Sequence, residues 1–151
     1  MTAAKKTRPQ HQASEYGLKP IDSDYDLFRW FLLCYMLGKP IQSSVAVKTW
    51  QLFVDRAVDA PWAIAHTPER TLSRMLVEGK YTRYNHVMAS ALKTMSNQLI
   101  EWYEGSLVLM LERSENEDEF WKRLKELYGV GPKTAEIVMR ETEEYFARRA
   151  E

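Results

Sequence analysis

The stretch Leu127-Tyr128-Gly129-Val130-Gly131-Pro132-Lys133-Thr134-Ala135 lies between two segments with helical periodicity. Apolar residues recur before it at Phe120 and Leu124, and a second stripe continues after it at Val138. Glycines make turns that residues with a Cβ strain to make, and proline suits the first turn of a helix because it has no N–H to lose. The stretch therefore predicts two helices joined by a Gly-Val-Gly turn, whose unpaired N–H groups and positive helix end can hold a phosphate.

The order Leu-x-Gly-Val-Gly-x-Lys-Thr-Ala resembles the helix-hairpin-helix of the HhH-GPD superfamily, the endonuclease III-like DNA glycosylases of base-excision repair. In that superfamily the hairpin grips the DNA backbone near a flipped-out base. The resemblance implies that Gly129, Val130, Gly131, Lys133 and Thr134 contact DNA. An ordinary corner between two helices remains the alternative.

Chain length and charge limit the classes of function. The 151 residues suggest one domain with a single core. Lysine and arginine number 21, as do aspartate and glutamate, so the formal net charge is zero. This balance argues against a protein held to nucleic acid by bulk charge alone, but a phosphate site made of backbone dipoles needs no excess of lysine. We therefore expect DNA binding of modest affinity that depends on few counterions.

Cysteine and histidine usage bears on cofactors. Cys34 is the single cysteine, so the chain forms neither an internal disulfide nor a four-cysteine iron–sulfur cluster. His11, His66 and His86 have no ligand-like spacing. We expect no metal, no iron–sulfur cluster and no other cofactor, although many endonuclease III relatives carry such a cluster.

The amino-terminal residues are polar and lack periodicity. They include Lys5, Lys6 and Arg8, and we predict a flexible tail over residues 1–20 before a helical domain at residues 21–151. The tail either touches phosphate nonspecifically or has no role. Its polar start is not a signal-peptide pattern, so we expect a cytoplasmic protein.

The apolar run Leu27–Leu37 predicts a buried central helix. Ser23 and Asp24 are capping candidates at its start, and Gly38 ends it. The run leaves almost no polar face, so other helices must enclose it. No stretch alternates with period two, and the expected fold class is all-α. The resemblance refines this to a six-helix barrel-like bundle that ends in a helix-hairpin-helix.

Gln42 precedes the next expected helix, at about residues 45–58. The run 42–48 resembles the family segment whose glutamine enters the duplex and fills the gap left by the flipped nucleotide. A small-residue stretch precedes that glutamine in the family, whereas Gly38-Lys39-Pro40-Ile41 stands here. Gln42 as an ordinary polar residue at a helix start remains the alternative.

A cationic and aromatic cluster follows Gly79 at another expected helix start. It consists of Lys80, Tyr81 and Arg83, with Tyr84 beside them. Aromatic rings with cationic groups suit stacking on bases and pairing with phosphates. In the family the equivalent segment lies near DNA. An amphipathic helix entrance with surface charges is the alternative.

Lys133 stands where bifunctional members of the family carry the lysine that attacks the sugar C1′ and forms a Schiff base. The positive end of a helix favours a free amine, which a nucleophile must be. The family also uses an aspartate in a loop beyond the hairpin, and that segment is absent: the last aspartate is Asp118, and we expect residues 136–149 to form one helix. Glu136 has the spacing of a solvated helical face.

Three functional hypotheses follow. The favoured one is a DNA-binding module of base-excision repair type that need not cut DNA. The second is an active DNA glycosylase or AP lyase that uses Lys133 with an acid from elsewhere. The third is a protein-interaction module. The expected partner is duplex DNA, held by its backbone phosphates, with no membrane; a homodimer is left open.

Overall fold

The computed structural model describes residues 11–151, and within them the chain is all-α, without a strand. The helix bounds are η1 Ala13–Tyr16 and η2 Pro20–Asp22 (both 3-10 helices), α2 Asp24–Leu37, α3 Ser43–Asp55, α4 Pro61–His66, α5 Glu69–Glu78, α6 Asn85–Tyr103, α7 Leu107–Arg113, α8 Glu117–Glu126, α9 Pro132–Met139 and α10 Glu143–Ala150. The predicted all-α class is confirmed.

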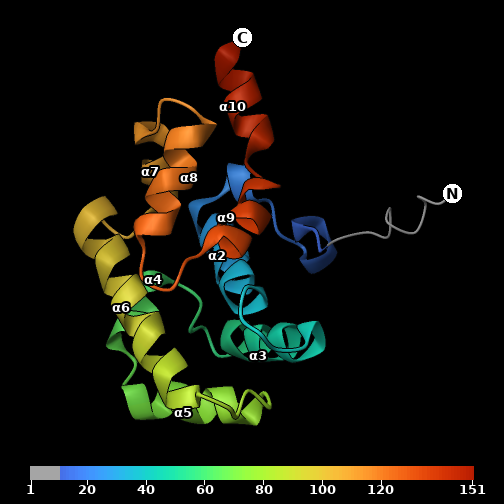
Figure 1. Ribbon diagram of the computed structural model, residues 1–151, viewed down its shortest axis with the longest axis vertical. Helices are drawn as coiled ribbons and strands as arrows, with labels where there is room; N and C mark the ends of the chain where they lie inside the picture. The colour runs from blue at the N-terminus through green and yellow to red at the C-terminus, as the bar shows by residue number, and fades with distance from the viewer. Residues whose placement is uncertain (1–10) are drawn as a thin grey trace, which may run out of the picture.

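Helix α2 is the centre of the bundle, as the apolar run predicts (Figure 1). Its amino end is capped by Ser23, whose Oγ accepts the Asp26 N–H at 3.2 Å, and Gly38 follows its last residue. From Trp30 to Leu37 every side chain is buried, so this part of α2 has no solvent face. It packs against α3, α7 and α9, and the Trp30 indole N–H donates to the Val138 carbonyl of α9 at 3.3 Å.

The remaining helices form two groups around α2. Helices α4 and α5 pack on the long α6, and α3 packs on α2 and α5. In Figure 1, α3 and α5 lie at the lower end of the molecule and α7, α8 and α10 at the upper end. Helix α9 contacts both α2 and α8, so the segment that joins α8 to α9 runs beside the carboxyl end of α2.

The flexible tail expected over residues 1–20 is wrong for residues 11–20, which pack on the helical core. Ala13 and Leu18 are buried, and the Ala13 N–H donates to the Glu141 carboxylate at 3.1 Å. Apolar contacts and a long-range hydrogen bond thus hold this segment on the helical core. Lys5, Lys6 and Arg8 lie outside the described residues.

The single helix expected over residues 136–149 is also wrong. Helix α9 ends at Met139 and α10 begins at Glu143, so a turn separates them. Thr142 at this turn is fully buried, and its N–H and hydroxyl both bond the Met139 carbonyl. A threonine side chain that competes for backbone groups favours such a break. Beyond the break, the Phe146 ring packs 6.0 Å from that of Phe120 in α8.

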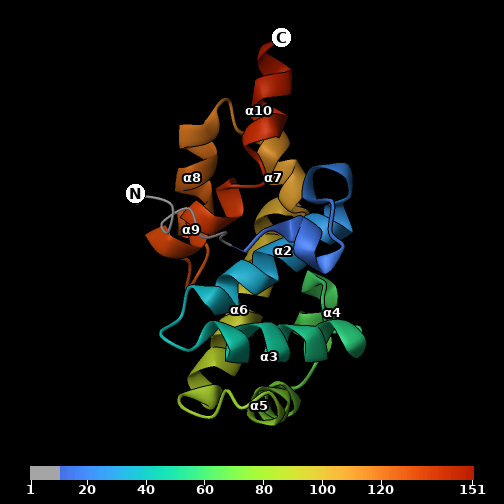
Figure 2. The same ribbon diagram turned by 90° about the vertical axis from the view of Figure 1, so that its right-hand side faces the viewer.

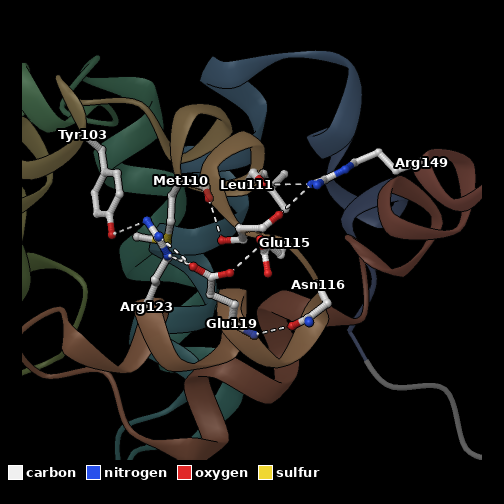
Figure 3. A network of polar contacts seen from close by, with 9 residues as sticks. Tyr103, Met110, Leu111, Glu115, Asn116, Glu119, Arg123 and Arg149 are labelled. Carbon is white, nitrogen blue, oxygen red and sulfur yellow. Dashed lines mark hydrogen bonds and ion pairs between the residues drawn. The ribbon is translucent and has the colours of Figure 1, made fainter.

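Polar contacts fix α10 to α7 and α8 to α6 (Figure 3). Arg149 of α10 donates to the carbonyls of Leu111 and Ser114 at 3.2 and 2.8 Å, which satisfies the carboxyl end of α7. Arg123 of α8 donates to the Glu119 carboxylate at 2.7 Å and to the Tyr103 hydroxyl at 3.4 Å.

No helix within residues 11–151 has both the length and the apolar character that crossing a bilayer requires.

Candidate functional site

The turn between α8 and α9 requires glycine at position 129. The Val130 N–H bonds the Leu127 carbonyl at 3.1 Å, and Gly129 has a φ of +81°, as at the third position of a type II turn. A Cβ at Gly129 would also lie 2.2 Å from the Tyr35 hydroxyl oxygen. That hydroxyl donates to the Tyr128 carbonyl at 2.8 Å. Both glycines were expected to be needed for the turn, but Gly131 is not. Its φ is −102°, which other residues adopt, and a Cβ there meets no atom within 4 Å.

The backbone N–H groups at the start of α9 are open. Within residues 11–151, the N–H groups of Gly129, Gly131 and Lys133 make no hydrogen bond, and Pro132 has none to offer. The first N–H bonded in the helix is that of Ala135, which donates to the Gly131 carbonyl at 3.1 Å. This positive helix end can accept an anion.

The side chains of Val130 and Thr134 are buried, at 7% and 2% exposed, whereas Tyr128 and Lys133 are exposed. Both were expected among the DNA contacts. A buried side chain cannot reach a phosphate, so the side chains of these two residues pack in the core beneath the turn and do not contact DNA. A Cβ at Gly38 would lie 2.0 Å from the Thr134 Oγ1, which shows how closely the end of α2 approaches α9.

Lys39 links the α2–α3 loop to the turn. Its Nζ donates to the Gly129 carbonyl at 2.8 Å and lies 4.3 Å from the centre of the Tyr35 ring. It forms no salt bridge with any carboxylate in residues 11–151. Burial lowers the pKa of the Lys39 ammonium, because desolvation disfavours the charged form.

A cavity of about 300 Å³ opens beside this contact. Its lining comes from the α2–α3 loop, the α5–α6 loop, the first turns of α6 and the turn before α9: Lys39, Pro40, Tyr81, Tyr84, Val87, Met88, Ala91, Tyr128 and Gly129. We call it the tyrosine cavity, after Tyr81, Tyr84 and Tyr128. Tyr84 and Tyr128 are 64% and 53% exposed, whereas Tyr81 is buried. No acidic side chain lines it.

The α5–α6 loop holds two residues in the left-handed region. Lys80 has a φ of +75° and Tyr84 a φ of +60°. Residues other than glycine adopt this backbone conformation at a cost of roughly 1 kcal/mol or more. Lys80 and Arg83 are exposed, and the Arg83 guanidinium carbon lies 5.1 Å from the Tyr84 ring centre. The expected cationic and aromatic cluster therefore forms, with Tyr84 rather than Tyr81 as its exposed ring.

Lys133 lines a different cavity, of about 200 Å³. Ser43 at the start of α3 and Glu136, one turn further along α9, also line it. Gln42 is exposed at the N-cap of α3, and its side chain caps no N–H. The structure thus brings Gly129, Lys39 and Tyr81 to one cavity and leaves Lys133 at another.

Sequence reasoning missed Lys39 and Tyr128 as site residues. Lys39 follows Gly38 in a loop, and nothing local marks it as the partner of a carbonyl 90 positions away. Tyr128 stands inside the quoted turn, yet only the tertiary structure places its ring at the cavity. The left-handed φ of Tyr84 has no sequence signature either, because glycine or asparagine is the usual sign of that conformation.

No metal-binding arrangement of three or more histidine, cysteine, aspartate or glutamate side chains occurs within residues 11–151. The expected absence of cofactors stays a prediction.

Comparison with known proteins finds no family model that matches the chain. No curated protein matches it significantly.

Proposed function

We propose that this chain is a DNA-binding protein of the DNA-glycosylase type, which grips the DNA backbone through the turn Gly129-Val130-Gly131. The residue pattern at this turn resembles the HhH-GPD hairpin, and the resemblance supports a role at damaged or distorted DNA in base-excision repair. The barrel-like arrangement of the family belongs to the same proposal.

One observation carries the proposal: open N–H groups at the start of α9 share a face with an exposed cationic and aromatic loop. In Figure 2 the turn before α9, the α2–α3 loop and the α5–α6 loop all lie on the left side of the molecule. Backbone amides suit phosphate oxygens, and Arg83 beside Tyr84 suits a base or a phosphate. Together they form a surface that can follow a nucleic-acid strand.

A substitution at Gly131 tests the backbone grip without disturbing the fold. Because a side chain there meets open space at an ordinary φ, both Gly131→Asp and its neutral control Gly131→Asn should fold. We expect a labelled duplex to bind in a salt-dependent manner when the affinity is measured by fluorescence anisotropy. Gly131→Asp should weaken this affinity roughly tenfold or more, because its carboxylate repels the phosphate, whereas Gly131→Asn should change the affinity little. Equal affinities of the two variants for the duplex would refute a contact between the DNA phosphate and this turn.

The second candidate is an active glycosylase or AP lyase with Lys133 as Schiff-base nucleophile. Glu136 favours it, because this carboxylate lines the same cavity as Lys133 and supplies an acid where the family's aspartate is missing. Borohydride trapping with an abasic duplex tests it: Lys133→Ala should abolish the adduct, and Glu136→Gln should slow its formation. Trapping that survives Lys133→Ala excludes this role.

The third hypothesis is a protein-interaction module. It would remain if the chain binds no DNA at any salt concentration, and the exposed rings of Tyr84 and Tyr128 also support it.

A further inference from the structure

The corner between α6 and α7 is a part of the surface that the proposed DNA contact does not use. Glu104 and Gly105 follow α6 with φ values of +56° and +78°, and the Ser106 Oγ accepts the Leu109 N–H at 2.9 Å to cap α7. In Figure 1 the carboxyl end of α6 lies at the left edge of the molecule. Two hollows border this corner, and they share no lining residue.

The first hollow, of about 550 Å³, is aromatic and cationic. Trp102, Tyr103, Arg113, Arg123 and Glu126 line it, and Trp102 is 41% exposed. Arg123 is paired with a carboxylate of its own helix at 2.7 Å, whereas the exposed Arg113 forms no salt bridge within residues 11–151. The Arg113 Nη1 donates to the Trp102 carbonyl at 3.1 Å, which holds this cation at the corner. We call this region the arginine hollow.

The second hollow, of about 470 Å³, is acidic. Asp22, Asp24, Glu104 and Glu112 line it, together with the half-buried apolar side chains at the start of α7, and no lysine or arginine does. In the described part of the chain none of these four carboxylates forms a salt bridge. Carboxylates gathered without a cation repel one another, so a cation supplied by a partner relieves this repulsion. We call this region the acidic hollow.

An exposed tryptophan also lies at the corner beside the acidic hollow. Trp62 of α4 is 54% exposed, and a Cβ at Gly105 would lie 2.8 Å from its indole nitrogen. Because Glu104 lines the acidic hollow and precedes Gly105, the indole and this carboxylate are neighbours. An indole face next to a carboxylate suits a guanidinium group.

The two hollows adjoin and carry opposite charge. Glu112 of the acidic hollow precedes Arg113 of the arginine hollow, and Glu104 follows Tyr103 in the same way. A surface with both signs side by side complements itself when a second copy is turned about a two-fold axis, because each sign then meets its opposite twice. The formal net charge of the chain is zero, so two copies do not repel each other at long range.

We propose that this chain pairs with a second copy of itself across the α6–α7 corner, with the arginine hollow of each copy against the acidic hollow of the other. Arg113 of one copy then meets Glu104, Glu112 and the Trp62 ring of the second copy. The exposed Trp102 supplies apolar contact at the same interface. Neither hollow shares a residue with the tyrosine cavity or the cavity of Lys133, so both cavities stay open in the pair.

Sedimentation equilibrium of the full chain measures this association. We expect a monomer–dimer equilibrium whose dissociation constant rises with salt, because exposed charges are screened. Arg113→Glu should raise the dissociation constant roughly tenfold or more, since it sets a like charge against the acidic hollow. Lys48→Glu is the matched control, because it changes the net charge equally while Lys48 is exposed on α3, outside both hollows.

A reciprocal exchange of charge tests the two-fold arrangement. The double variant Glu104→Arg/Glu112→Arg brings cations into the acidic hollow and should also lose self-association. Mixed in equal amounts with Arg113→Glu, it should form mixed dimers, because one contact keeps its native charges and the other has both charges exchanged. Circular dichroism confirms that each variant is folded.

Three outcomes overturn the proposal. The first is a wild-type chain that stays monomeric up to roughly 100 μM at low salt. The second is a dimer whose dissociation constant changes no more in Arg113→Glu than in Lys48→Glu. The third is a mixture in which the two charge-exchanged variants both remain monomeric.

Discussion

The Lys39 Nζ and the Gly129 carbonyl oxygen lie 2.8 Å apart although 90 positions separate these residues in the chain. This contact joins the loop after α2 to the turn before α9, and both segments border the tyrosine cavity. The carbonyl of Gly129 is thereby held by an amine, while the neighbouring N–H groups stay open. This hydrogen bond orients the turn.

Removing the Lys39 amine should loosen the turn. Lys39→Met keeps an unbranched side chain but loses the hydrogen bond and the ammonium over the Tyr35 ring, so we expect a loss of roughly 1 kcal/mol in the free energy of unfolding, or about 3 °C in Tm. Thermal unfolding measures it. Lys48→Met is the control, because Lys48 is exposed and makes no side-chain contact of this kind within residues 11–151; equal losses in both variants would contradict the assigned role.

Glycine should be essential at position 129 and dispensable at position 131. Gly129→Ala places a Cβ at a φ of +81° and 2.2 Å from the Tyr35 hydroxyl oxygen, so we expect a loss of roughly 2 kcal/mol or more by urea unfolding. Gly131→Ala places its Cβ in open space at an ordinary φ and should change stability by less than about 0.5 kcal/mol. Similar effects at the two positions would show that the turn differs from the one described.

Alkaline pH should destabilise the fold through Tyr35. Burial raises the pKa of the Tyr35 phenol, so the folded state keeps it neutral at a pH where the unfolded chain ionises it. Its contribution to stability is complete below the ordinary tyrosine pKa of about 10 and is lost as the pH rises from there toward the raised value. Urea unfolding between pH 8 and pH 11 measures this slope.

Tyr35→Phe is the matching variant for that measurement. It removes the ionisable group and should flatten the alkaline slope, while the lost bond to the Tyr128 carbonyl lowers stability at neutral pH by roughly 1 kcal/mol. An unchanged slope in Tyr35→Phe would assign the alkaline loss to other groups.

Arg149 should hold α10 on the bundle. Arg149→Ala leaves the carbonyls of Leu111 and Ser114 without this donor, so hydrogen exchange of the α10 amides should accelerate. Arg148→Ala is a close control, because Arg148 pairs only with the exposed Glu144 in the described structure, and such pairs contribute roughly 0–1 kcal/mol. If both variants exchange alike, the network of Figure 3 does not anchor α10.

Local sequence determined the features that depend on neighbours within a few positions. The apolar run from Leu27 to Leu37 could form only an enclosed helix, and Ser23 and Gly38 mark its ends because capping acts within one turn. Gly129 marks the turn before α9 because no other residue adopts its φ as readily. The all-α class follows from the same short-range periodicity.

Only the tertiary structure decided which of these features meet. The packing of Ala13 beside Glu141 and the Lys39–Gly129 bond involve partners that no local pattern reveals. The separation of Lys133 from the tyrosine cavity has the same origin, since a side chain's neighbours depend on how α2, α6 and α9 pack. Periodicity records which face of a helix is buried; it carries no information about which distant residue covers that face, because packing is set by the shape of the whole core.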